Sequence, residues 1–131
     1  MGSEHLAYEG PFVVLEYART ANGQMPAKEH FHRLDASDQV KIQRIWNYVS
    51  QNPNWGHPHK FKKVEGETNL WEIKSFQQRM FAAWASRRSG TKRRLLLICG
   101  LIVPKKRDRL KPSELQRARR IRDEHFQCWE Q

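Results

Sequence analysis

The spacing of hydrophobic and polar residues changes about half-way along this 131-residue chain. In the first half, four apolar residues recur at i, i+3, i+4 and i+7: Ile42, Ile45, Trp46 and Val49. This spacing places them on one face of an amphipathic helix, which Asn52-Pro53-Asn54 ends. A shorter helix is predicted from Pro26 to about Leu34, because proline suits the first helical turn. Together the two helices would form a hairpin.

Runs of strand length surround these helices. Residues 12–17 are mostly β-branched or aromatic and predict a first strand. After residue 60 the pattern predicts three further strands, at residues 70–74, 79–86 and 95–103. The last of these is a continuous apolar run, which is typical of a central strand. Residues 88–92 contain a glycine and predict a hairpin tip, so the three strands would form an antiparallel meander.

A C-terminal helix is predicted to begin at Pro112-Ser113-Glu114 and to carry several arginines. The element order is then βαα, βββ and α. We therefore expect one α+β domain over residues 1–131, with an N-terminal strand and a helical hairpin packed on an antiparallel sheet. Residues 1–10 are expected to be flexible.

Composition narrows the class of protein. No apolar run approaches the roughly 18 residues that a membrane span needs, and the N-terminus lacks a signal-peptide pattern. We expect a cytoplasmic protein with no membrane partner. Two cysteines, Cys99 and Cys128, are too few for a disulfide scaffold and are expected to be thiols.

The net charge of +10 lies entirely in the second half of the chain. Residues 1–58 hold five basic and six acidic residues, a net charge of −1, whereas residues 59–131 hold 19 basic and eight acidic residues, a net charge of +11. Such an excess is typical of a protein with a polyanionic partner, with nucleic acid before an acidic protein. A solvated basic face that only aids solubility is the alternative.

No metal or cofactor site is predicted. The chain has no glycine-rich phosphate loop and no CxxC motif, and the pairs His30/His32 and His57/His59 lack a companion ligand at a recognisable spacing. Glu72-x-Lys74 resembles part of some metal-dependent nuclease sites, but no acidic partner stands just upstream of it at a strand end. Trp71 and Trp84 could stack on bases, although core packing is the favoured interpretation.

Cations cluster where the ends of the predicted strands would meet. They are Lys60, Lys62, Lys63, Lys74, Arg79, Lys105, Lys106 and Arg107. Such a cluster suits phosphate binding, and it also suits metal-free RNA cleavage, in which the RNA 2′-OH attacks the adjacent phosphate and cations stabilise the phosphorane. Spacing alone leaves open the alternative that these are separate surface bases.

From Glu16 to about His125 the chain resembles the RelE/ParE toxin superfamily, in particular its phage-derived HigB-like branch. The opening EYARTANGQMPAKEHFHRLD is similar to the branch's first strand, turn and "P-x-x-x-F-x-x-L" helix. The stretch HPHKFKKVEGETNLWEIK is similar to "H-x-K-x-L … G-L-W-E-L-R". Arg79 stands where the family begins its next strand, and the ending matches "KK … K-P-x-E-x-x-x-A" with Lys105, Lys106, Lys111, Pro112, Glu114 and Ala118.

This resemblance implies a toxin of a type II toxin–antitoxin system with a twisted sheet, a RelE-like fold. It implies a metal-independent endonuclease that cleaves mRNA on the ribosome, inhibits translation and is neutralised by an antitoxin, often a helix-turn-helix protein. The implied catalytic residues are Lys74, Arg79, Lys63 and His59. The implied nucleic-acid-binding residues are Lys60, Lys62, Lys105, Lys106, Arg107 and Lys111.

The chain departs from the family pattern in three places. Lys74 stands where arginine is usual, which replaces a bidentate fork by a point charge. Cys99-Gly100-Leu101 stands where His-Gly-Phe is common, and the general acid is unassigned, with His125 a remote candidate. Two alternatives therefore stay open: a ParE-like toxin that inhibits DNA gyrase without a catalytic centre, and a basic nucleic-acid-binding module. The Arg-rich last helix could contact RNA or an antitoxin.

Overall fold

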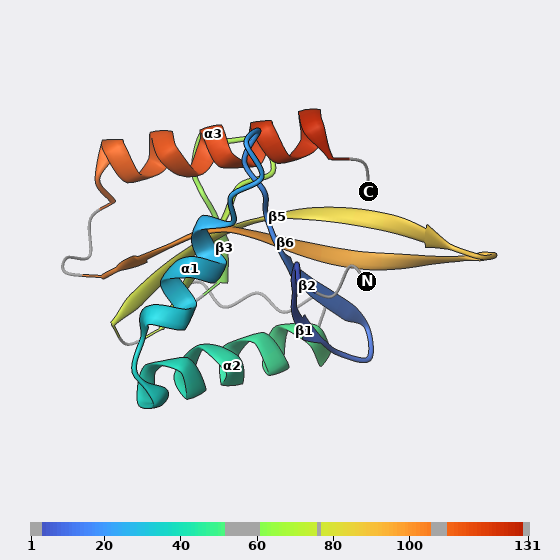
Figure 1. The fold of residues 1–131 in the computed structure, drawn as a ribbon, viewed down its shortest axis with the longest axis horizontal. Coiled ribbons are helices and arrows are strands. Elements are labelled where there is room, and N and C mark those ends of the chain that lie inside the picture. Colours follow the sequence, from blue (N-terminus) through green and yellow to red (C-terminus); the bar gives the residue numbers. More distant parts are fainter. Residues whose placement is uncertain (1–3, 52–60, 76, 106–109, 130–131) are drawn as a thin grey trace.

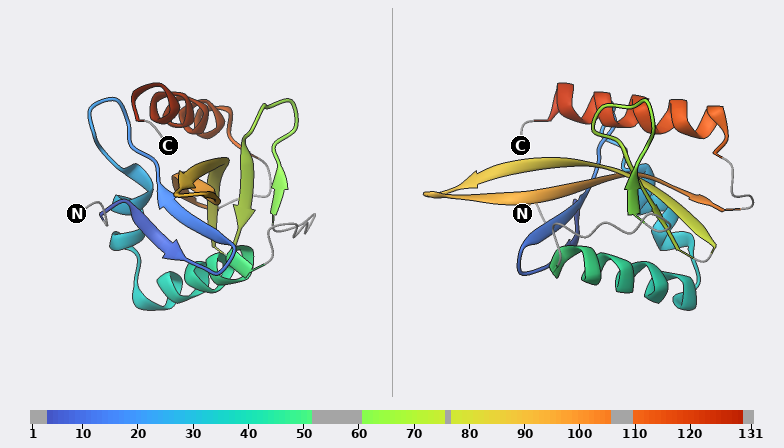
Figure 2. Two further views of the ribbon diagram at one scale, coloured as in Figure 1. Left: turned by 90° about the vertical axis from the view of Figure 1, so that its right-hand side faces the viewer. Right: turned by 180° about the vertical axis from the view of Figure 1, so that it is seen from behind.

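The computed structural model describes residues 4–51, 61–75, 77–105 and 110–129. Its strands are β1 (Leu6–Glu9), β2 (Val13–Tyr17), β3 (Phe61–Lys63), β4 (Trp71–Lys74), β5 (Gln78–Ser89) and β6 (Lys92–Pro104). Its helices are α1 (Pro26–Arg33), α2 (Ala36–Gln51) and α3 (Pro112–Cys128). The strands form one six-stranded sheet in the order β1-β2-β6-β5-β4-β3. Helices α1 and α2 cover one face of this sheet and α3 covers the other (Figures 1 and 2).

Strand β6 lies at the centre and is buried on both faces. Its side chains alternate between two cores: Leu97, Cys99 and Ile102 point toward α1 and α2, and Leu96, Ile98 and Leu101 point toward α3. It pairs with β5 antiparallel and with β2 parallel. The register between β5 and β6 shifts at Gly100, where a Cβ atom would lie 3.3 Å from Ile121 Cγ2 of α3. A glycine at this bulge therefore lets α3 approach the sheet closely.

The core under α1 and α2 is built around Trp46. Its ring stacks on Phe31 with centroids 5.1 Å apart and meets Tyr17 edge-on at 6.1 Å. Its indole N–H, which burial would otherwise leave without a partner, donates to Met80 S at 3.2 Å. The face predicted for α2 is confirmed, because Ile42, Trp46 and Val49 are buried.

The α+β class, the two N-terminal helices, the β4-β5-β6 meander and the C-terminal helix are confirmed. Four features differ from the sequence prediction, and the first is β3, a short strand that pairs with β4 and is absent from that prediction. Residues 6–9 form β1, which pairs with β2 through backbone hydrogen bonds that require no apolar run. The sheet is mixed rather than wholly antiparallel, because β2 and β6 are parallel. After β2 the chain passes through α1 and α2 to β3 at the far edge of the sheet, and β6 then pairs with β2. Strands β5 and β6 continue almost to the tip at Gly90 and Thr91.

The turn between β1 and β2 is held against the end of α2 at a glycine. Phe12 N–H donates to Ser50 O at 3.2 Å, and Gly10 N–H donates to Val13 O at 3.0 Å. Any Cβ atom on Gly10 would overlap Ser50 Cβ and Oγ, and Ser50 is fully buried. With a serine at position 50, only glycine fits at position 10.

We expect Gly10→Ala to lower the free energy of unfolding by about 1–3 kcal/mol, the usual cost of overpacking. Urea unfolding followed by circular dichroism measures it. Ser50→Gly removes the two overlapping atoms, so Gly10→Ala should cost much less in that background. Equal costs in both backgrounds would contradict the proposed overlap.

Candidate functional site

The structure brings three of the predicted cations onto one face of the sheet. Lys74 pairs with Arg79 across β4 and β5, and Lys62 pairs with Glu72 across β3 and β4. Directly opposed residues share a face, and so do residues two apart on one strand. Leu70, two residues before Glu72, packs in the core beneath α3. The face that carries Lys62, Glu72, Lys74 and Arg79 is therefore the α3 face.

Arg79 forms a buried ion pair with Glu72. Its Nε lies 2.5 Å from Glu72 Oε2, and both side chains are only 2% exposed. Two buried charges are tolerated because each compensates the other, whereas either alone would be costly. The pair joins β4 to β5 beside Lys74, which is directly opposite Arg79. Because the Arg79 side chain is buried, it can affect this surface only by holding the two strands together.

The other predicted residues are distributed around this point. Lys62, Lys63 and Lys111 are exposed, and Lys74 and Lys105 are partly buried. Lys63 lies opposite Trp71 on the other face of the sheet, so it does not join Lys62 and Lys74. The backbone N–H of Lys105 donates to Gln77 O at 2.8 Å, which places this residue beside the β4–β5 turn. The predicted His59, Lys60, Lys106 and Arg107 lie outside the described residues.

A small cavity of about 160 Å³ lies at the opposite end of the α3 face. Its lining includes His5, Glu16, Arg87, His125 and Trp129. The Arg87 guanidinium donates two hydrogen bonds to the Glu16 carboxylate, at 2.7 and 2.8 Å. This hydrogen bonding raises the pKa of Arg87. Sequence reasoning missed this constellation because its residues come from distant segments. The one available signal is a carboxylate, Glu16, within an otherwise apolar strand.

His125 joins the end of α3 to the segment after β2. Its Nδ1 accepts the backbone N–H of Arg19 at 3.0 Å, which places the ring proton of a neutral imidazole on Nε2. The Arg19 guanidinium lies 4.6 Å from the centroid of the Trp129 ring, a cation–π contact. These contacts fasten the C-terminal helix to the rest of the domain and give His125 a structural role.

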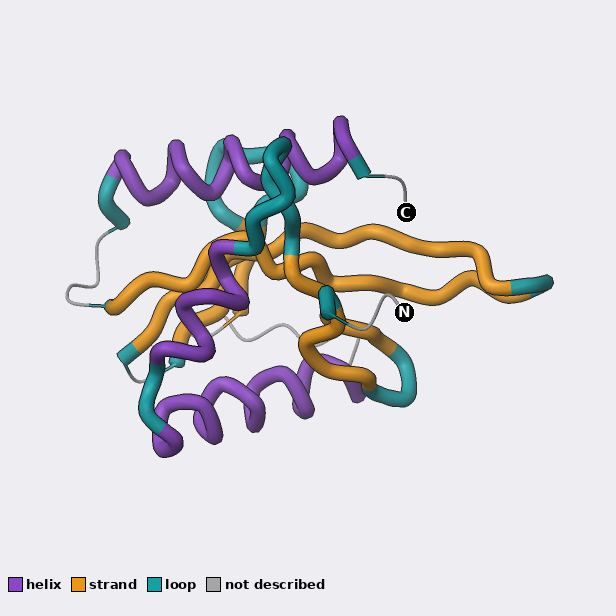
Figure 3. The backbone as a smooth tube through the Cα atoms, viewed as in Figure 1, coloured by secondary structure: helices purple, strands orange, loops and turns teal. Residues whose placement is uncertain are grey.

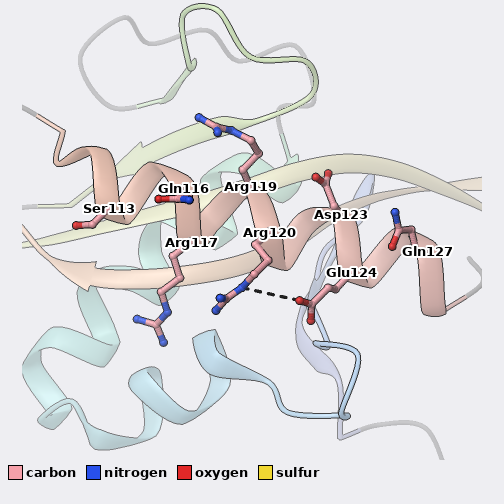
Figure 4. A pocket seen from close by; sticks show the side chains of 8 residues that line it. All are labelled: Ser113, Gln116, Arg117, Arg119, Arg120, Asp123, Glu124 and Gln127. Atoms are coloured by element: carbon pink, nitrogen blue, oxygen red, sulfur yellow. Dashed lines mark ion pairs between the residues drawn. The ribbon is translucent and has the colours of Figure 1, made fainter.

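A hollow on the outer side of α3 is lined by eight side chains of this one helix (Figure 4). Its charges are partly neutralised within the chain. Arg120 Nε lies 3.8 Å from Glu124 Oε2, and Arg119 Nη2 lies 2.9 Å from Glu67 Oε2 of the β3–β4 connection. Two arginines of this helix, Arg119 and Arg122, therefore hold the β3–β4 connection in place.

Cys99, which stands where the RelE/ParE-like pattern commonly has histidine, is not available for chemistry at this surface. Cys99 is fully buried in the core beneath α1 and α2, and this burial raises the pKa of its thiol to about 12. Burial, together with the neighbouring Cys99, also raises the pKa of Tyr17. A thiol in such surroundings is inert. Among the described residues, no three His, Cys, Asp or Glu side chains gather as a metal site would require.

No family model matches the chain, and no curated protein matches it. The resemblance to the RelE/ParE toxins therefore stays a prediction from the sequence. Within the described part of the chain, no helix is long and apolar enough to cross a membrane.

Because Glu72 compensates a buried guanidinium, we expect Glu72→Gln to lower the free energy of unfolding by about 3–5 kcal/mol. Urea unfolding measures the loss. Glu65→Gln, at an exposed carboxylate nearby in the chain, is the matched control and should change stability by less than about 0.5 kcal/mol. Equal free energies of unfolding for the two variants would show that the Arg79–Glu72 ion pair does not contribute to stability as proposed.

The two thiols should differ sharply in reactivity. A thiol-disulfide reagent at pH 8 should modify one cysteine of the folded protein, the exposed Cys128, and both in denaturant. In the Cys128→Ser variant the folded protein should not react, because the raised pKa of Cys99 and its burial withhold the thiolate. Rapid reaction of this variant would contradict the burial of Cys99.

Proposed function

We propose that this protein is the toxin of a type II toxin–antitoxin system, a metal-independent endonuclease that cleaves mRNA on the ribosome. The observation that carries the proposal is that Lys62 and Lys74 lie on the same face of two adjacent strands, diagonally across the β3–β4 ladder, at the end where Lys105 follows β6. The family resemblance, which covers most of the chain, places its RNA site in this same segment.

The chemistry needs few groups from the protein. The 2′-OH of the RNA gives its proton to a base as its oxygen attacks the adjacent phosphorus, and the P–O bond to the 5′-oxygen breaks as that oxygen takes a proton from an acid, which leaves a 2′,3′-cyclic phosphate and a 5′-OH. Negative charge on the phosphorane oxygens rises between these events. Lys62 and Lys74 are the candidates to hold the phosphate and to stabilise that charge. Arg79 is a positioning residue, because its pairing with Glu72 fixes the strand from which Lys74 projects.

The partners follow from this activity. The substrate is mRNA within the ribosome, which supplies a polyanionic surface suited to the net charge of +11 over residues 59–131. An antitoxin, of the helix-turn-helix kind by resemblance, would neutralise the toxin. The protein would act in the cytoplasm.

One observation favours a second candidate, a ParE-like toxin that binds DNA gyrase without cleaving RNA. Arg79, which the resemblance assigns to the transition state, is 2% exposed and engaged by Glu72. A guanidinium in that position contacts a phosphate only if the pair opens. A toxin that acts by binding alone requires no such opening.

We expect the Lys62→Ala/Lys74→Ala double variant to relieve the growth arrest caused by inducible expression. It should also lower mRNA cleavage by about 10²-fold or more, the usual cost of losing groups that stabilise transition-state charge. Mapping of mRNA 5′ ends measures cleavage. The control is Arg33→Ala/Arg44→Ala, which removes two exposed charges from α1 and α2 and should leave both effects intact.

The same experiment separates the two candidates. Growth arrest with a DNA-damage response and unchanged mRNA 5′ ends would refute the nuclease and support the gyrase-directed toxin. Cleavage that persists in the Lys62→Ala/Lys74→Ala variant would show that the site lies elsewhere.

A further inference from the structure

The outer part of the β5–β6 hairpin extends beyond the rest of the sheet. We call residues 86–94 the arm. Strand β2 pairs with β6 only from Leu95 onward, and β4 pairs with β5 only up to Ala82, so within the arm the two strands pair only with each other. Figure 3 shows this two-stranded ribbon projecting past the helices to its tip.

The arm is cationic throughout. It holds five basic residues and no acidic one: Arg87, Arg88, Lys92, Arg93 and Arg94. Four of these form two directly opposed pairs, since Arg87 pairs with Arg94 and Arg88 with Arg93. Like charges directly opposite each other destabilise a β-ladder. An arm with this sequence is therefore less stable than its length would allow, which indicates a role outside folding.

The pair nearer the sheet is used to anchor the arm. Arg87 binds Glu16 through its two terminal nitrogens, and Arg94 donates to the carbonyl oxygens of Gly10 and Pro11 at 2.5 and 3.2 Å. Both arginines therefore have partners on or beside the N-terminal strands. The base of the arm is fixed.

The outer cations have no such compensation. Arg88, Lys92 and Arg93 are exposed, and no carboxylate of the described residues lies within ion-pair distance of them. Arg93 donates only to Ser86 Oγ, at 2.9 Å. On α3, by contrast, Arg119 and Arg122 lie against Glu67. Uncompensated positive charge is thus concentrated at the outer end of the arm.

We propose that the arm binds the sugar-phosphate backbone of helical RNA, as a docking element separate from the Lys62/Lys74 surface. The arm contains no apolar side chain to bury against a protein and no aromatic ring to stack on the bases of a single strand. What it offers is charge at a narrow tip, which suits phosphates and gives binding independent of sequence. The choice of RNA over DNA rests on the proposed function.

The test uses the full chain and a labelled 20-base-pair RNA duplex, with binding followed by fluorescence anisotropy at several salt concentrations. The variant Arg88→Ser/Lys92→Ser/Arg93→Ser should bind about 10–100-fold more weakly near 0.1 M salt. It should also lower the slope of log K against log salt by about one per cation removed. The matched control, Arg33→Ser/Arg44→Ser/Arg117→Ser, has the same net charge and should bind within about threefold of the unaltered protein.

A single substitution separates binding from folding. Arg88→Glu replaces a repulsive cross-strand pair by an attractive one, so the melting temperature should be unchanged or raised while RNA binding weakens. Equal losses in the arm variant and its control would overturn the proposal, because affinity would then follow net charge alone. Tighter arm-dependent binding of a DNA duplex, a single-stranded RNA or an acidic peptide would also overturn it.

The outcome is independent of catalysis, because the RNA duplex is bound without ribosomes and need not be cut. Arm-dependent binding together with unchanged mRNA 5′ ends would support the arm and refute the nuclease. Cleavage by a protein whose arm variant binds the duplex as well as the unaltered chain would refute the arm alone.

Discussion

The whole structure depends on one strand that is apolar on both sides. From Leu95 to Val103, β6 offers side chains to two cores in alternation, so each helical layer has an apolar surface to cover. Its backbone groups are taken up by β5 on one side and β2 on the other. A polar side chain in this segment would be buried without a partner on whichever face it pointed to. This constraint keeps charged residues out of β6 between Leu95 and Val103.

Two buried carboxylates of the sheet each form an ion pair with an arginine of β5. Glu72 holds Arg79 at one end of β5, and Glu16 holds Arg87 near the other, both on the α3 face. The first pair joins neighbouring strands, whereas the second reaches across β6 to β2. Both arginines belong to the strongly basic half of the chain, yet each is paired with a buried carboxylate of the same protein. The Arg79–Glu72 pair adds nothing to the net charge of +11 over residues 59–131, and Glu16, which lies outside that segment, offsets one further unit of it.

Much of this fold could be predicted from residue spacing, because the periods of α2 and β6 are set by burial on one face and on both. The parallel pairing of β2 with β6 could not, since it depends on how α1 and α2 carry the chain across the sheet. The burial of Arg79 could not either, because an arginine at a strand start is compatible with an exposed cation and with a buried ion pair. Only the position of Glu72 across the ladder decides between them.

The same logic separates the cations that hold the fold from those that can serve a partner. An arginine paired with a carboxylate of its own chain gains less from a phosphate than an unpaired arginine does, because part of its charge and hydrogen-bonding capacity is already engaged. Arg119 is such a residue, at 2.9 Å from Glu67. Lys74 and the outer cations of the arm lie on two surfaces at opposite ends of β5 and β6. A long polyanion can contact both ends at once, whereas a small anion can occupy only one. Two separated cationic ends on one pair of strands therefore fit the proposed nucleic-acid partner, with one end for the proposed docking and the other for the proposed chemistry.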